Sequence, residues 1–298
     1  MYPQFMTENA IIGSRNGSTI YDYGACTVPQ LLVGFDERIY DPGYAQPVQE
    51  NGTHMNYNPC REDEMYLGYA IDTFGGHQSQ DGPWDFVLLN DNTRNPAREK
   101  TRARALQEIE QFYVPLFQQT GATPVFLWTH AYSVESTQTR NMTGLEDVAN
   151  FTSLTKVGYD AYVELLKLYL PSSQTPRIAP VGLAFLVVYE EDRDMWDALF
   201  HNADHLHASP SGTFLQGCIV YYTLFERMPD REIVIQGNMS VLWKRARMMQ
   251  HAWEPPNPYP TTEVAKYLYR VAERVMVEGF VPDSFIDYQN GESAYIPE

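Results

Sequence analysis

Residues 202–225, NADHLHASPSGTFLQGCIVYYTLF, place two ionisable side chains directly ahead of an apolar segment. Asp204 and His207 are three residues apart, and a Ser-Pro-Ser-Gly stretch follows them. A histidine that moves a proton from a hydroxyl to a leaving group needs a carboxylate partner to fix its tautomer and to stabilise its charged form. The apolar spacing from Thr213 onward predicts a buried helix. We therefore expect the pair at the mouth of a helix.

This pattern, D-x-x-H followed by Ser, Pro and Gly, resembles the last motif block of the SGNH/GDSL hydrolase superfamily. The resemblance implies a serine ester hydrolase in which His207 is the general base and Asp204 is its orienting carboxylate. Two other interpretations stay open. A D-x-x-H pattern is short enough to occur in an ordinary surface turn. The chain also carries histidines around Asp204, as a metal site would, at positions 201, 205 and 207.

Two weaker blocks of the same superfamily have counterparts here. Residues 23–32, YGACTVPQLL, resemble the second block, and the resemblance implies that the bare backbone amide of Gly24 is an oxyanion donor. Residues 84–93, WDFVLLNDNT, form an apolar stretch that ends in side-chain amides, like the third block. That likeness makes Asn92 the second oxyanion donor. Asn90 remains an alternative, because Asn90 and Asp91 stand where glycines are common in the block.

The serine nucleophile of the first block has no clear counterpart. Ser14 and Ser18 are the candidates, but they precede Gly24 by only ten and six residues, where the superfamily places the blocks tens of residues apart. The sequence therefore favours a nucleophile encoded upstream of Met1, and we expect very low activity from the chain as numbered. The resemblance spans roughly residues 18–225. The alternative function is a non-catalytic binding protein that kept the cleft and lost the serine.

Strand-like and helix-like segments alternate along the chain. This alternation predicts one three-layer α/β/α domain with a mostly parallel sheet over residues 1–298. Within it, residues 36–83 form a long loop excursion and residues 226–298 close the fold. The predicted strands are 18–23, 84–93, 124–129, 178–185 and 233–235, and the predicted helices are 63–74, 96–119, 152–170, 185–200, 213–225, 240–251 and 261–277.

Composition narrows the class of partner. The chain of 298 residues is 44% hydrophobic, which is ample for a core, and carries a net charge of −17. Such acidity argues against nucleic acid and anionic membranes as partners, because both reward clustered Lys and Arg. No run of residues is long and apolar enough to span a membrane. We expect no cofactor, and the resemblance implies a small-molecule or carbohydrate ester as substrate. Tyrosines and asparagines of the 36–83 loop suit a sugar, although the loop can equally be an ordinary surface loop.

Five N-x-[ST] sequons favour a secreted protein over a cytoplasmic one, at Asn16, Asn51, Asn141, Asn150 and Asn238. The first residues lack the basic and apolar regions of a signal peptide, so the two locations stay open. The three cysteines allow one disulfide at most, between Cys26 and Cys60, and leave Cys218 in the predicted helix as a free thiol.

Overall fold

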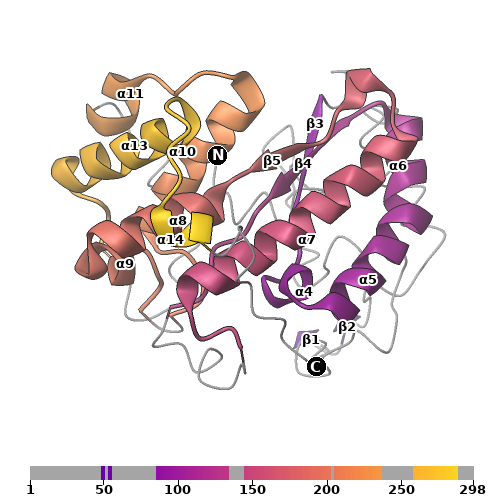
Figure 1. Cartoon of the computed structure of the whole chain (residues 1–298), viewed down its shortest axis with the longest axis horizontal. Helices are drawn as coiled ribbons and strands as arrows, with labels where there is room; N and C mark the ends of the chain where they lie inside the picture. Colours follow the sequence, from indigo (N-terminus) through magenta and orange to yellow (C-terminus); the bar gives the residue numbers. More distant parts are fainter. Residues whose placement is uncertain are drawn as a thin grey trace.

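The computed structural model of the chain describes residues 48–50, 53–55, 85–133, 144–202, 205–236 and 258–287. Its centre is a parallel sheet of three strands in the order β3-β4-β5 (Figure 1). The strands are β3 (Phe86–Leu89), β4 (Thr123–Leu127) and β5 (Arg177–Ala179). Leu89 pairs with Phe126, and Leu127 pairs with Ala179. The residues that follow all three strands therefore meet at one edge of the sheet.

Helices connect the strands, as parallel pairing requires. The β3–β4 crossover contains α4 (Arg94–Ala97), α5 (Glu99–Glu108), a π-helical segment (Ile109–Tyr113) and α6 (Val114–Thr120). The β4–β5 crossover contains α7 (Val148–Tyr169) and a short 3₁₀ turn (Ser172–Gln174). These observations confirm an α/β fold with a parallel sheet.

The helices of the two crossovers form one group, and the helices after β5 form a second group. They are α8 (Val181–Glu191), α9 (Arg193–Ala198), α10 (Pro210–Phe225), α11 (Arg231–Gln236), α13 (Thr262–Met276) and α14 (Asp283–Asp287). In Figure 1 α5, α6 and α7 gather on one side of the strands, and α8, α10 and α13 gather on the other. Strand β5 contacts both α7 and α10. The core runs continuously through both groups, from Phe117 and Tyr159 to Leu215 and Leu268, all fully buried.

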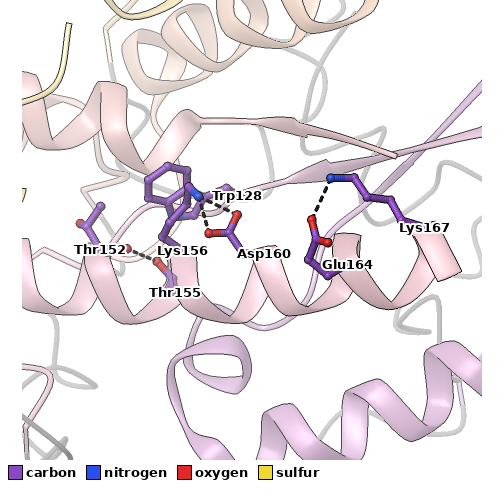
Figure 2. A network of polar contacts seen from close by, with 7 residues as sticks. All are labelled: Trp128, Thr152, Thr155, Lys156, Asp160, Glu164 and Lys167. Carbon is purple, nitrogen blue, oxygen red and sulfur yellow. Dashed lines mark hydrogen bonds and ion pairs between the residues drawn. The ribbon is translucent and has the colours of Figure 1, made fainter. Parts of the chain in front are cut away.

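Trp128, the residue after β4, ties the sheet to helices of both groups. Its indole N–H donates to the Thr155 hydroxyl at 2.9 Å, and that hydroxyl donates to the carbonyl of Thr152 at 2.8 Å. The Lys156 ammonium lies 5.8 Å from the centroid of the Trp128 ring and pairs with Asp160 (Figure 2). On the other side, Gly182 of α8 donates its backbone N–H to the Trp128 carbonyl at 2.9 Å. A buried indole thus fixes where the chain leaves β4.

The helix predicted over residues 96–119 is not continuous. It breaks at Arg98, whose backbone is extended, and passes through the π-helical segment before α6. Pro115 explains the second irregularity, because it has no N–H to donate to the turn before it. By contrast, the helices predicted over 152–170 and 261–277 are confirmed as α7 and α13, capped by Asp147 and Thr261.

The strand predicted at 178–185 is much shorter in the structure, and the strand predicted at 233–235 is wrong. At the first of these stretches, only the three residues Arg177–Ala179 pair as a strand, β5. Pro180 follows them and has no N–H to donate to a longer ladder. The rest of that stretch is α8, which is apolar all round because it is buried. Residues 233–235 are helical within α11, whose first turn is capped by the Asp230 carboxylate at 3.0 Å from the Ile233 amide.

The 36–83 excursion contains an antiparallel pair, β1 (Val48–Glu50) and β2 (Thr53–Met55). The strand predicted at 18–23, the helices predicted at 63–74 and 240–251, and the cysteines Cys26 and Cys60 lie outside the described residues. Cys218 is a buried free thiol in α10, as expected.

Candidate active site

The segment that carries His207 folds back against α9 and leads into α10. Phe200 and Ala208 form an antiparallel bridge, and the His207 carbonyl accepts from the His201 amide at 2.8 Å. His205 occupies the left-handed region at φ 55°, which turns the chain between them. The side chain of His207 is partly exposed. The turn therefore places a partly exposed histidine immediately before a helix.

Ser209 fixes the start of that helix. Its hydroxyl donates to the Ala198 carbonyl at 2.6 Å and accepts from the amides of Ser211 and Gly212 at 3.1 and 3.2 Å. This is the N-cap role that serine favours, and it leaves Ser209 1% exposed. Gly212 is needed for the same closure, since a Cβ there would lie 2.3 Å from the Leu199 carbonyl. Burial raises the pKa of the Cys218 thiol to about 12. Because the Ser209 hydroxyl is already used as a cap and the Cys218 thiol stays protonated, neither residue is suited to be a nucleophile.

Asn92 lies in the turn between β3 and α4, as its place after an apolar strand implies. Its side-chain oxygen accepts from the Arg94 amide at 3.2 Å and from the Tyr132 hydroxyl at 3.4 Å. Within the described part of the chain, no partner occupies its side-chain nitrogen, and the residue is exposed. With its oxygen engaged in this way, Asn92 has an N–H pair left to donate.

The alternative donor, Asn90, occupies different surroundings. It lines a cavity of about 20 Å³ between β3 and the α5 side of the molecule, with Ala105, Ile109 and Tyr162 among its walls. A space of that size holds about one water molecule. Asn92 instead contacts Tyr132 from the segment after β4. The two asparagines therefore have different neighbours: Asn90 lies beside the cavity on the α5 side, and Asn92 lies beside Tyr132.

The segment after β4 connects Asn92 to the His207 turn. Tyr132 contacts Asn92, and two residues earlier the His130 Nε2 lies 3.2 Å from the carbonyl of Leu206. Asn92 and the His207 turn are thus both attached to the edge where β3 and β4 end. In open α/β sheets this edge is where ligands bind. Gly24 and Asp204 lie outside the described residues, so their places relative to His207 stay predictions.

Sequence reasoning did not assign a role to Asp91, the half-buried carboxylate next to Asn92 in the chain. Asp91 accepts from the Asn92 amide at 2.7 Å, from the Asn95 side chain at 2.8 Å and from the Tyr162 hydroxyl at 2.9 Å. Burial raises the pKa of Asp91 above its ordinary value, and these three donors oppose the rise. Burial, with a smaller contribution from the same carboxylate, raises the pKa of Tyr162. Asp91 thus holds the turn that carries Asn92.

His130 and Tyr132 were also missed. The available signal was the polar stretch that follows the strand predicted at 124–129, the same signal that pointed to Asn92.

The described residues also bear on metal binding and on membrane spans. They contain no group of three or more His, Cys, Asp or Glu side chains arranged to hold a metal. None of their helices has the length and apolar character needed to cross a membrane.

Comparison with known proteins adds little to this geometry. No protein-family model matches the chain, and no curated protein matches it. Among solved structures, the chain is similar to a DUF4886 family protein from Bacteroides uniformis, with 14% sequence identity and a TM-score of 0.42. The match covers 67% of this chain and 65% of that one, so the chain spans about two thirds of the length of its neighbour.

Proposed function

We propose that the protein is an SGNH-type serine ester hydrolase acting on small acyl esters, carbohydrate esters included. In this proposal the three described strands are the central part of a three-layer α/β/α sandwich. His207 is the general base, Asp204 orients it, and Gly24 and Asn92 donate to the oxyanion. The observation that carries the proposal is the attachment of the His207 turn and of Asn92 to the same edge of a parallel sheet.

The chemistry follows from what each group can do. His207 takes the proton of an attacking hydroxyl and returns it to the leaving alcohol. The Asn92 N–H pair and the Gly24 amide stabilise the negative charge that develops on the acyl oxygen. The attacking serine is either Ser14, Ser18 or a residue upstream of Met1, and the last is the one that the block spacing favours.

A covalent probe can test the whole assignment at once. We expect a fluorophosphonate to label one serine in a form of the protein that includes the sequence preceding Met1. The label and the hydrolysis of a short-chain nitrophenyl ester should both fall by several orders of magnitude in His207→Ala. His205→Asn is the matched control, because it changes a histidine of the same turn and asparagine tolerates a left-handed backbone.

Each outcome has a distinct meaning. Labelling of Ser14 or Ser18 would contradict the upstream placement but keep the hydrolase. No labelling and no hydrolysis would contradict the hydrolase and favour the non-catalytic binding protein. Equal loss in the two histidine variants would remove His207 from the role of general base.

A further inference from the structure

We propose that His130 is a positioning residue that holds the His207 turn through one imidazole tautomer, the form protonated at Nε2. The residue lies in the segment that follows β4 and is 8% exposed. Its ring stacks on Phe185 of α8, with centroids 4.3 Å apart and planes 15° from parallel. It also meets the edge of Phe200, the residue whose bridge to Ala208 closes the turn.

The hydrogen bonds of the ring determine the tautomer. Nε2 lies 3.2 Å from the Leu206 carbonyl, which can only accept, so Nε2 must carry a proton. Nδ1 lies 3.3 Å from the side-chain nitrogen of Gln216, which can only donate, so Nδ1 must accept. Gln216 is buried on α10, the helix that follows the turn. The two contacts agree on a proton at Nε2 and an accepting Nδ1, and they join the segment after β4 to the turn and to α10.

Leu206 immediately precedes His207, so this bond acts on the backbone next to the proposed base. A ring clamped between Phe185 and two hydrogen bonds has little freedom to rotate, and the Leu206 carbonyl shares that restraint. Its consequence for hydrolysis rests on the proposed function. The positioning itself does not, because it can be measured on the backbone of the turn without any substrate.

Two isosteric substitutions separate the two nitrogens of the ring. The glutamine of His130→Gln places an amide where Nε2 stands and can still donate to Leu206. The asparagine of His130→Asn places its amide where Nδ1 stands and can still accept from Gln216, but it does not reach Leu206. Both variants lose the stack on Phe185, so we expect similar falls in melting temperature from the two.

Hydrogen exchange at the amides of His201 and Ser209 reports the turn, because these amides donate to the His207 and Leu199 carbonyls. We expect His130→Asn to raise both exchange rates by about tenfold and His130→Gln to stay within about threefold of the wild type. The amide of Leu170, which donates to Leu166 at the end of α7, is the internal control and should not change. Equal rates in the two variants would overturn the proposal.

The wild-type protein supplies a test that needs no substitution. With nitrogen-15 in its histidines, NMR should find His130 neutral and protonated at Nε2, and a proton at Nδ1 instead would also overturn the proposal. If the ester is hydrolysed, His130→Asn should lower kcat by about tenfold at unchanged KM, while His130→Gln should not. Absence of hydrolysis in the wild-type form that includes the sequence preceding Met1 contradicts the proposed function alone and leaves the exchange result decisive for His130.

Discussion

At the scale of single residues, the side chain of Asn92 is oriented before any substrate arrives. The Arg94 amide and the Tyr132 hydroxyl both donate to its oxygen, so its nitrogen is directed elsewhere. In a form that hydrolyses an ester, Asn92→Ala should lower kcat by about 10²–10³ with little change in KM, because the interaction forms with the developing oxyanion. Steady-state kinetics on a nitrophenyl ester measure both constants.

Asn90→Ala is the control for that measurement, since Asn90 lines the cavity on the α5 side. It should leave kcat within about threefold of the wild type. A loss in Asn90→Ala with none in Asn92→Ala would assign the oxyanion role to Asn90.

The half-buried carboxylate of Asp91 leads to a prediction about how stability depends on pH. Its folded-state pKa is raised above 3.8, so folding favours its protonated form. The contribution of Asp91 to stability is then fully present below pH 3.8 and is lost as pH rises through the raised pKa. The free energy of unfolding of the wild type, measured in urea relative to Asp91→Asn, should therefore fall over that window. A difference that grows with pH would mean that the three hydrogen bonds outweigh burial.

Sequence could point to some candidate site residues because they sit in local patterns. Asn92 follows an apolar strand, and His207 stands in a short motif before a helix. Asp91 and His130 could not be assigned, because their partners are distant in the chain. Tyr162 is 71 residues from Asp91, and Leu206 is 76 residues from His130. Only the folded chain shows that these side chains meet.

At the scale of elements, the contact between α4 and α7 depends on a glycine. A Cβ on Gly158 would lie 2.3 Å from the Cβ of Pro96, too close for either helix to stay in place. Gly158→Ala should lower the free energy of unfolding by about 1–3 kcal/mol, because overpacking outweighs the gain in helix propensity. Chemical denaturation measures the change.

Gly217 supplies the matched control, because it also lies within a helix and a Cβ there would meet nothing within 4 Å. Gly217→Ala should raise the free energy of unfolding by about 0.5–1 kcal/mol. A stabilised Gly158→Ala protein would show that α4 and α7 are not in contact at these residues.

The errors in the predicted elements share a physical cause. The apolar stretch that became α8 is buried along its whole length, so it shows no amphipathic period to separate helix from strand. Short elements are also hard to predict, because few residues define their period. The helix α11 has only six residues, and one carboxylate, that of Asp230, caps its first turn. The long helices α7 and α13 have both a cap and a polar face, and they were predicted within a few residues.

At the scale of the whole molecule, the α/β class followed from the alternation of strands and helices. The order of the strands did not, because it depends on pairing between distant residues such as Leu89 and Phe126. The net charge of −17 has no bearing on the fold, and we expect it to disfavour polyanions as partners. The prediction of a secreted location rests on the sequons, and one of the five can be judged from the structure.

Asn150 lies in the first turn of α7 and is 6% exposed. Its side-chain nitrogen, the atom that would carry a glycan, donates to the Gly144 carbonyl at 3.3 Å. A glycan there would open the start of α7, so we expect none on the folded protein. After expression in a secretory eukaryotic host, deglycosidase treatment should lower the mass of the protein, and Asn150→Gln should leave that mass change as it is. Asn16→Gln, Asn51→Gln, Asn141→Gln and Asn238→Gln combined should abolish it. No mass change in the wild type would contradict the secreted location, and a smaller change in Asn150→Gln would contradict the buried position of that residue.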